Sequence, residues 1–430
     1  MRAPVLCPLP CIFAFVNDNE AVAILGGGAA GFFGAIACAE ANPRLRVYLI
    51  EKTGKLLSKV RISGGGRCNV THAADTPAQL VQHYPRGAKQ LKEPFKQFGA
   101  VDTVRWFERR GVRLKTEADG RMFPVTDSSE TIAQALLTAA DKAGVRILTH
   151  TTAEQITALP AGGFRLHLTG AHAQELVVAR LLIATGGAPK TTQYDWLRAL
   201  GHTIAEPVPS LFTFNVPESP LRELPGVSVP HARVRIAGEK LEYEGPILVT
   251  HWGVSGPAVL KLSAWGARRL HELEHRHTAL ISWLPTHTED SLRQWLLEFR
   301  GQHGKKQVTS NPLFGLPQRL WRTLTEQAGI GAEVKWNELP VKQQNRLIES
   351  LLRTALPVQG KTTYKDEFVT CGGVVLGEVD MKTMQSRRVP GLYFAGEVLD
   401  IDGITGGFNF QAAWTTGYLA GRAMAAAPAG

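Results

Sequence analysis

The sequence has few cysteines, and no long apolar run stands out in it. Five cysteines occur in 430 residues, and no two of them form a C-x-x-C pair: Cys7, Cys11, Cys38, Cys68 and Cys371. An odd, widely spaced set argues against a disulfide framework and a structural zinc site, and it favours a reducing cytoplasm. No stretch reaches the roughly 18 apolar residues of a membrane-spanning helix. We therefore expect a cytoplasmic protein with no membrane span and no metal.

The residue patterns of several other functional classes are also missing. No metal-ligand cluster, Ser/His/Asp set or pair of carboxylates stands out, which argues against metal and hydrolase chemistry. The net charge is +10, but the basic residues are scattered and no basic stripe with interleaved aromatic residues occurs. A solvated basic surface is the favoured interpretation, so nucleic acid is not an expected partner. The oligomeric state stays open.

The length predicts two to three domains. From about Pro207 prolines become dense and alternating stretches indicate a small antiparallel barrel, while the stretch from 289 to 355 has helical periodicity. The α/β texture resumes near Lys365. We predict an α/β protein with four parts: a disordered extension at 1–20, a discontinuous Rossmann-like FAD domain at 21–200 and 365–430, an inserted β-barrel domain at 201–288 and 356–364, and a small helical domain at 289–355.

A βαβ unit follows the extension. The apolar run at 21–25 predicts a buried parallel strand, and the small apolar residues 29–41 predict a helix that packs closely on a sheet. A second strand is predicted at 46–50. The segment GGGAAG at 26–31 lies between the first strand and the helix, which is the context that identifies a G-x-G-x-x-G dinucleotide-binding loop.

Each glycine of this loop has a separate task. Gly26 allows the tight turn, Gly28 lets a diphosphate approach the backbone, and Gly31 lets the helix and strand pack closely. The helix begins at Ala29 and Ala30, where free N–H groups and the positive end of the helix dipole meet the diphosphate. We predict that the loop binds the diphosphate of a dinucleotide.

The acidic end of the second strand completes the nucleotide site. Glu51 follows that strand, 25 residues after Gly26. A carboxylate in this place accepts hydrogen bonds from the ribose hydroxyls of adenosine. We expect Glu51, with its neighbour Lys52, to bind this part of the cofactor.

Segments far from the loop favour FAD over NAD. The apolar run at 176–183 predicts a later strand, which Thr185 and Gly186 close, and Gly396 with Glu397 ends a strand near the C-terminus. Both patterns are typical of flavoproteins with a dinucleotide fold. No second complete G-x-G-x-x-G follows a strand, so a separate NAD(P)H domain is not predicted.

Two glycine-rich segments are predicted to contact the flavin. The loop SGGGRCN at 63–69 offers unusual backbone angles beside a planar ligand, an arginine for anionic charge and an asparagine for hydrogen bonds. The segment GITGGFNFQ at 403–411 leads into the last helix, whose N-terminus stabilises negative charge on a reduced flavin. The contacts expected from these segments are Gly65, Gly66, Arg67, Asn69, Gly406, Gly407, Asn409 and Phe410.

Two residues are candidates for catalysis, each with a structural alternative. Cys68 lies in the first glycine-rich loop, but a thiol without a partner is more often a small residue in a packed loop. His251 lies in THWGVSGP after a predicted barrel strand, where an imidazole could act as an acid or base near neutral pH. A structural role is the favoured interpretation of both, so the catalytic residues stay unassigned.

The chain resembles the BaiN-like (YhiN-like) flavoprotein family from about Ala21 to Ala425. Five segments carry the resemblance: GGGAAG at 26–31, SGGGRCN at 63–69, GRMFP at 120–124, THWGVSGPAVLKLS at 250–263, and the long segment from GGVVLGEVD to WTTG at 372–417. The resemblance implies a discontinuous FAD domain, a β-barrel domain and a helical domain inserted in the barrel. Activities attached to relatives disagree, so it implies the cofactor but no single substrate.

Three functional hypotheses follow. The first is an FAD-dependent oxidoreductase that acts on an unidentified small molecule, with a flavin reduced by NAD(P)H or by the substrate itself. The second is a flavin-dependent amine oxidase of the aminoacetone type, which uses dioxygen. The third is an FAD-containing module that binds RNA or a protein without turnover. A flavin performs the electron chemistry in the first two, and the protein positions it.

Overall fold

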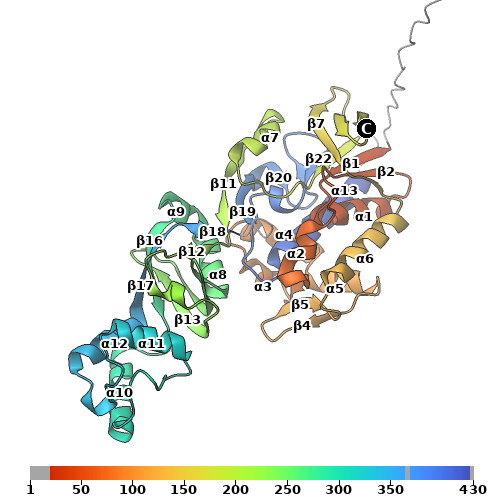
Figure 1. Ribbon diagram of the computed structural model, residues 1–430. Helices are drawn as coiled ribbons and strands as arrows, with labels where there is room; N and C mark the ends of the chain where they lie inside the picture. Colours follow the sequence, from red (N-terminus) through yellow and green to blue (C-terminus); the bar gives the residue numbers. More distant parts are fainter. Residues whose placement is uncertain (1–19, 364–368, 427–430) are drawn as a thin grey trace, which may run out of the picture.

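The computed structural model describes residues 20–363 and 369–426. The predicted extension at 1–20, except Glu20, lies outside the described residues, as do Cys7 and Cys11. The molecule is elongated, with a large α/β part at one end, a barrel in the middle and a group of helices at the far end (Figure 1). The prediction of an α/β protein with a Rossmann-type FAD domain is confirmed.

The α/β part is built on a seven-stranded sheet in the order β20-β21-β22-β10-β1-β2-β6. The run β22-β10-β1-β2-β6 is parallel, and Val22 of β1 lies opposite Val47 of β2 and Arg180 of β10. All five residues of β1 are buried, as expected for a parallel strand covered on both faces. The strands are β1 (Ala21–Leu25), β2 (Arg46–Ile50), β6 (Arg146–Leu148), β10 (Arg180–Ile183), β20 (Val379–Asp380), β21 (Gln385–Ser386) and β22 (Leu392–Phe394).

Two helices from opposite ends of the chain pack together on this sheet. They are α1 (Ala29–Ala41) and α13 (Phe408–Ala426). A Cβ at Gly417 would lie 2.4 Å from the carbonyl oxygen of Ala30, and one at Gly421 would lie 2.2 Å from that of Gly34. The two backbones are therefore in direct contact, which ties the C-terminal segment to the phosphate loop at the start of α1.

One predicted strand is divided between two sheets. The apolar run at 176–183 was expected to form a single strand, but it forms β9 (Gln174–Val178) and β10. Val178 pairs with Phe164 in the small antiparallel sheet β7-β8-β9, whereas Arg180 pairs with Val22 in the large sheet. The prediction of a single strand was wrong because apolar periodicity does not reveal a change of partner. The neighbouring strands are β7 (Thr151–Ala158) and β8 (Phe164–Gly170).

The remaining elements of the α/β part surround the sheet. A three-stranded sheet contains β3 (Thr71–His72), β5 (Arg121–Pro124) and β4 (Leu114–Thr116). The helices are α2 (Ser58–Gly66), α3 (Pro77–Val81), α4 (Ala88–Gln97), α5 (Ala100–Glu108), α6 (Ser129–Lys142) and α7 (Asp195–Ala199).

A pair of antiparallel strands joins the α/β part to the barrel. It consists of β11 (Ile204–Ser210) and β19 (Val369–Val374). Figure 1 shows this pair between the two parts. The chain enters the barrel after β11 and returns to the α/β part through β19. This pair therefore determines how the barrel faces the large sheet.

The barrel is a second seven-stranded sheet, in the order β17-β16-β13-β14-β15-β12-β18, and its pairs are antiparallel. One residue, Gly360, separates β17 from β18 in the chain, so the two edges of the sheet meet. The strands are β12 (Thr213–Asn215), β13 (Ser228–Ile236), β14 (Glu242–Thr250), β15 (Gly253–Ser255), β16 (Arg276–Ser282), β17 (Thr354–Gln359) and β18 (Lys361–Thr362), with helices α8 (Pro257–Trp265) and α9 (Ala267–Glu272).

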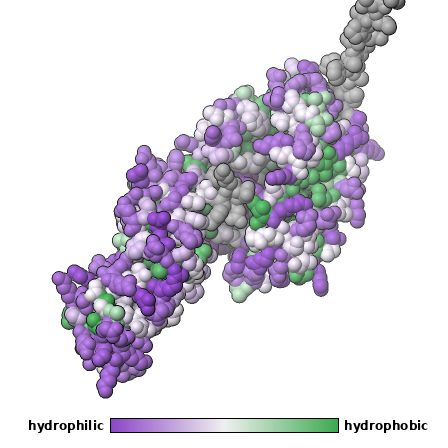
Figure 2. Space-filling view, in the orientation of Figure 1, coloured by the Kyte–Doolittle hydropathy of each residue, from purple (hydrophilic) through white to green (hydrophobic). Residues whose placement is uncertain are grey.

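Three helices form the far end of the molecule, between β16 and β17. They are α10 (Glu289–His303), α11 (Gln318–Gln327) and α12 (Val341–Arg353). Trp321 and Trp336 are fully buried and belong to the same hydrophobic cluster as barrel residues such as Phe214. The visible surface of these helices is mostly hydrophilic (Figure 2), although Leu297 and Val341 are exposed.

Candidate flavin-binding site

A cavity of about 660 Å³ lies beside the phosphate loop. Such a volume is typical of a cofactor or ligand site. Its wall includes sixteen of the predicted cofactor-binding residues: Gly26, Gly28, Ala29, Ala30, Glu51, Lys52, Gly65, Asn69, Thr185, Gly186, Gly396, Glu397, Gly406, Gly407, Asn409 and Phe410. Leu211, Ser255 and Leu260 reach the same wall from the barrel and the chain leading into it. The fold thus brings segments that are far apart in the sequence to one cavity.

The phosphate loop has space where a diphosphate would lie. A Cβ at Gly26 would come within 2.4 Å of the carbonyl oxygen of Ala184, and one at Gly31 within 1.9 Å of that of Gly26. A Cβ at Gly28, by contrast, would meet no protein atom within 4 Å. Protein packing therefore requires glycine at positions 26 and 31, whereas Gly28 leaves an open space at the start of α1. This cradle fits a dinucleotide diphosphate.

Glu51 is held in place by the backbone. One carboxylate oxygen accepts from the N–H of Gly27 at 2.9 Å, and the other accepts from the N–H and hydroxyl of Thr53, both at 2.9 Å. The carboxylate therefore sits at a defined place on the cavity wall beside the phosphate loop. Lys52 is exposed at the edge of the same wall.

The segment predicted as a glycine-rich loop is the distorted end of helix α2. Ser63 is extended, and Gly64 and Gly65 have positive φ angles of 59° and 68°. Asn69 follows, and its amide is satisfied when it donates to the carbonyl of Thr71 and accepts from the N–H of Gly407, both at 3.0 Å. The distorted end of α2 is thereby bonded to the turn that precedes α13.

The turn before α13 is stabilised by its own polar side chains. The amide of Asn409 accepts from the N–H of Gly403 and donates to its carbonyl, both at 2.8 Å. Buried Gln411 accepts from the hydroxyl of Thr71 at 2.6 Å. The N-terminus of α13 therefore points at the cavity in a fixed direction, and its dipole favours negative charge there.

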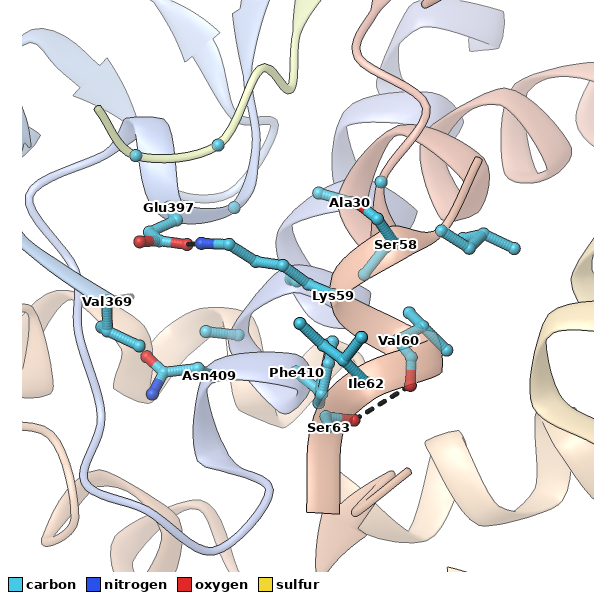
Figure 3. Close-up of a pocket in the computed structure, with 18 of the residues that line it drawn as sticks. Ala30, Ser58, Lys59, Val60, Ile62, Ser63, Val369, Glu397, Asn409 and Phe410 are labelled. Carbon is cyan, nitrogen blue, oxygen red and sulfur yellow. Dashed lines mark hydrogen bonds and ion pairs between the residues drawn. The ribbon is translucent and has the colours of Figure 1, made fainter. Parts of the chain in front are cut away.

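An ion pair on the cavity wall was not anticipated. The Lys59 ammonium extends from α2 to a carboxylate oxygen of Glu397 at 2.7 Å, as Figure 3 shows. The other oxygen of Glu397 accepts from the N–H of Thr370 at 2.8 Å. Nothing in the sequence pairs Lys59 with Glu397, because 338 positions separate them. Only the folded chain brings them together.

Five predicted site residues lie off the cavity wall. Gly31 packs behind the phosphate loop, and Gly66 follows the distorted turn of α2. The guanidinium of Arg67 pairs with Glu117 at 2.7 Å and lies 4.0 Å from the ring centroid of Phe123. Cys68 is fully buried, and burial raises the pKa of its thiol to about 12. His251 is exposed, and its carbonyl accepts from Arg222.

Neither a metal site nor a membrane span is found in the described part of the chain. His271 and His275 do stand at H-x-x-x-H spacing, with ring centroids 5.8 Å apart. Across residues 20–363 and 369–426, however, no group of three or more His, Cys, Asp or Glu residues could hold a metal ion. In the same residues no helix has the length and apolar character that crossing a membrane requires.

The HI0933-like protein Rossmann domain family matches residues 20–423. The chain belongs to this family. The predicted resemblance to BaiN-like flavoproteins is thereby confirmed. The chain is an FAD-dependent oxidoreductase, as the sequence predicted.

Two curated relatives match almost the whole chain. The 3-dehydro-bile acid delta(4,6)-reductase of Clostridium scindens is 31% identical over 95% of this chain and 99% of its own. The ribosomal RNA dihydrouridine synthase of Escherichia coli is 31% identical over 94% of this chain and 98% of its own. The crystal structure of 3-ketosteroid-delta4-(5alpha)-dehydrogenase from Rhodococcus jostii RHA1 shares the fold, with a TM-score of 0.50, 14% identity and coverage of 96% and 98% of the two chains.

Proposed function

We propose that this flavoprotein reduces a carbon–carbon double bond conjugated to a carbonyl group, with NAD(P)H as the electron donor. The observation that carries the proposal is the full-length match to two enzymes with different substrates but one kind of reaction. A 4-ene next to a 3-oxo group and the 5,6-double bond of uracil are both conjugated to a carbonyl. Each product gains a hydride at the carbon remote from the carbonyl and a proton at the carbon next to it.

A uracil base in ribosomal RNA is the substrate that we favour. The net charge of +10 and the pI of about 9.4 suit a polyanion, because phosphate contacts supply most of the affinity in RNA complexes. The scattered basic residues by themselves favoured a solvated surface. Together with the match to the dihydrouridine synthase, we now interpret them as support for RNA binding. A bile-acid-type enone is the second candidate, supported by the match to the bile acid reductase.

The residues on the cavity wall bind and orient the cofactor in this proposal. The backbone at Gly28 and the start of α1 bind the diphosphate, and Glu51 binds the ribose of adenosine. Gly65, Gly406 and Gly407, which line the same cavity, would hold the flavin ring. Bound FAD supplies hydride transfer. The N-terminus of α13 stabilises negative charge beside that ring.

We place the reaction in the cytoplasm. The three described cysteines, Cys38, Cys68 and Cys371, are free and buried. Unpaired thiols of this kind are usual in a reducing compartment. NAD(P)H is available there as the donor.

Anaerobic stopped-flow spectroscopy tests the proposal in two steps. The FAD-loaded protein is first mixed with NADH or NADPH, and loss of the visible absorbance of oxidised flavin is followed. The reduced protein is then mixed with a uridine-containing RNA oligonucleotide or with a 3-oxo-4-ene bile acid. Matched controls are the same oligonucleotide with 5,6-dihydrouridine at that position and the saturated 3-oxo bile acid.

We expect reduction by one of the two nucleotides and reoxidation only by the unsaturated compounds. Reoxidation by neither unsaturated compound would contradict the proposed reaction. A flavin that NADH and NADPH leave oxidised, but that an amine reduces and dioxygen reoxidises, would support the aminoacetone-type oxidase instead. Mass spectrometry of the oligonucleotide then identifies the reduced base.

A further inference from the structure

The segment THWGVSGP places a serine on the barrel side of the cavity. Ser255 ends strand β15, and it lines the cavity together with Leu260 of helix α8. The residues to which we assign cofactor binding belong to the α/β part, whereas Ser255 belongs to the barrel. Figure 1 shows α8 on the side of the barrel that faces the α/β part. Ser255 therefore lies on a part of the wall to which the cofactor-binding residues do not contribute.

The hydroxyl of Ser255 is buried, yet it has no partner in the protein. The residue is 9% exposed, and its Oγ forms no hydrogen bond with a described residue. Among the described residues, the polar side-chain atoms that are both sealed from solvent and unpaired belong to other positions, such as His277 and Thr370. The Oγ of Ser255 therefore reaches open space, and the open space beside this residue is the cavity. A buried hydroxyl in this situation is suited to bond to a ligand.

The hydroxyl has no role in stabilising the fold around it. Ser255 directly precedes Gly256, the N-cap of α8, but its Oγ accepts from no N–H group of the first turn. Backbone contacts hold the residue instead, because Ser255 lies opposite Leu248 of β14. A Cβ at Gly256 would lie 2.7 Å from the carbonyl oxygen of Pro246, so the chain stays close to β14 after the serine. The backbone thus fixes the position of a side chain that no neighbour uses.

The positive end of a helix lies next to this hydroxyl. Helix α8 spans nine residues and begins at Pro257, two positions after Ser255. The first N–H groups of a helix have no partner within it, and the helix dipole adds positive charge at this end. Leu260, one turn into α8, lines the cavity, so this end of the helix borders the same space as the hydroxyl. A hydroxyl donor beside a helix N-terminus suits an oxygen that gains negative charge during a reaction.

Two leucines give the same side of the wall an apolar surface. Leu211 and Leu260 line the cavity together with Ser255. Leu211 has a positive φ of 55°, which a leucine rarely adopts. The N–H of the next residue, Phe212, donates to the hydroxyl of Ser263 on α8 at 2.9 Å, which holds this turn against the helix. Strained backbone that its surroundings fix in place is common where a protein contacts a ligand. The wall therefore suits an apolar ring that carries one polar oxygen.

We propose that the hydroxyl of Ser255 donates a hydrogen bond to the carbonyl oxygen of the substrate, while Leu211 and Leu260 contact the ring that carries this carbonyl. The inference rests on the proposed function, because it names the group that recognises the substrate in the same cavity. The carbon remote from the carbonyl accepts the hydride that NAD(P)H supplies through the flavin, and the electron pair of the double bond moves towards the carbonyl oxygen. Ser255 and the N-terminus of α8 stabilise this enolate, which then takes a proton from water at the carbon next to the carbonyl.

Infrared difference spectroscopy of the oxidised, FAD-loaded protein tests the contact without turnover. The probes are a uridine-containing RNA oligonucleotide with carbon-13 at the uracil carbonyl next to the 5,6-double bond, and a 3-oxo-4-ene bile acid with carbon-13 at its 3-oxo group. Ser255→Ala and Ser255→Cys remove the strong donor, and either decides the test if the other does not fold. Ser255→Thr keeps the hydroxyl, and Ser228→Ala is the control at the exposed start of β13. Flavin content and the midpoint of thermal unfolding show that each variant is folded and loaded.

We expect the labelled carbonyl band of one probe to move to lower frequency on binding to the unaltered protein, because a hydrogen bond weakens the C=O bond. The shift should be lost in Ser255→Ala and Ser255→Cys and retained in Ser255→Thr and Ser228→Ala. In anaerobic stopped-flow experiments, NAD(P)H should reduce the flavin of every variant at an unchanged rate. Reoxidation by the probe compound should slow at least about tenfold in Ser255→Ala, because the enolate loses its donor.

The contact is overturned if neither probe shows a shift, or if the shift survives Ser255→Ala. An unchanged rate of reoxidation in Ser255→Ala would also overturn the contact, while the proposed reaction would stand. Failure of the proposed function has a different signature. A shift that depends on Ser255, in a protein whose reduced flavin neither compound reoxidises, would support the contact and contradict the reaction.

Discussion

At the residue scale, the glycines of the phosphate loop have different tasks that a sequence motif does not separate. The pattern at 26–31 shows where the glycines lie, but not whether protein or ligand requires each one. Gly31 faces the carbonyl of Gly26, whereas Gly28 faces open space. Substitutions at the two positions should therefore affect different properties.

We predict that Gly28→Ala weakens FAD binding by at least about tenfold, near 1.4 kcal/mol, because the added methyl group enters the space left for the diphosphate. The stability of the FAD-free protein should hardly change, since no protein atom lies within 4 Å of the new Cβ. Gly31→Ala should instead lower the free energy of unfolding by about 1–3 kcal/mol. Flavin fluorescence titration and chemical denaturation of both variants measure the two effects. Equal effects of the two substitutions on unfolding would contradict this division.

At the element scale, the contact between α1 and α13 joins the two ends of the FAD-binding part. Gly417 and Gly421 lie one helical turn apart on α13, and each faces a carbonyl oxygen of α1. Close backbone approach of this kind needs residues without side chains. The spacing was visible in the sequence, but the partner helix was not.

We predict that Gly421→Ala lowers the free energy of unfolding by about 1–3 kcal/mol, because its Cβ would lie 2.2 Å from the carbonyl oxygen of Gly34 and the helices must separate. The matched control is Gly301→Ala in α10, where a Cβ meets nothing within 4 Å. That exposed helical position should become more stable by about 0.5–1 kcal/mol. Urea denaturation compares the two. A neutral Gly421→Ala would show that α1 and α13 are not in close contact.

At the scale of the whole molecule, a buried ion pair ties the α/β part to the barrel. Arg86 pairs with Asp402, which is fully buried, and it also donates to the carbonyl of Ala264 on α8 at 2.6 Å. The hydroxyl of Ser210, at the end of β11, donates to Asp402 at 2.8 Å. Burial raises the pKa of Asp402 despite the attraction of Arg86. The seam therefore depends on a fully buried carboxylate and on the guanidinium that pairs with it.

We predict that Arg86→Met lowers the free energy of unfolding by about 3–5 kcal/mol, because it leaves the carboxylate of Asp402 buried without a cation. The double variant Arg86→Met with Asp402→Asn should lose less, since no uncompensated charge remains. The control is Arg105→Met, which removes an exposed pair with Asp102 and should change stability by less than about 1 kcal/mol. Denaturation at neutral pH measures all three. If Arg86→Met lowers the free energy of unfolding no more than the control does, the pair of Arg86 with Asp402 does not stabilise the seam.

The division of the chain into domains is a second proposal that concerns the whole molecule. We propose that 21–200 with 365–430, 201–288 with 356–364, and 289–355 form separate domains. The large sheet and the barrel have separate hydrophobic clusters, which supports the first boundary. The three far helices share the cluster of the barrel, so limited proteolysis should release them less readily than it cuts between the α/β part and the barrel.

The sequence by itself determined the local parts of this protein. The strand, turn and helix at 21–41, the acid after the second strand and the glycine-rich segments at 63–69 and 403–411 depend on neighbours in the chain. Backbone angles, helix dipoles and apolar periodicity act over a few residues, so such patterns can be read directly. These patterns were sufficient to predict the fold class and the FAD cofactor.

Only the tertiary structure decided which distant side chains meet. It divided the run at 176–183 between two sheets and joined Lys59 to Glu397. It also left Cys68 and His251 off the cavity wall. Contacts such as these join residues that lie far apart in the sequence, and no local pattern carries that information. The dinucleotide-binding loop can therefore be predicted from the sequence, whereas the substrate side of the cavity is formed by long-range contacts that only the folded structure shows.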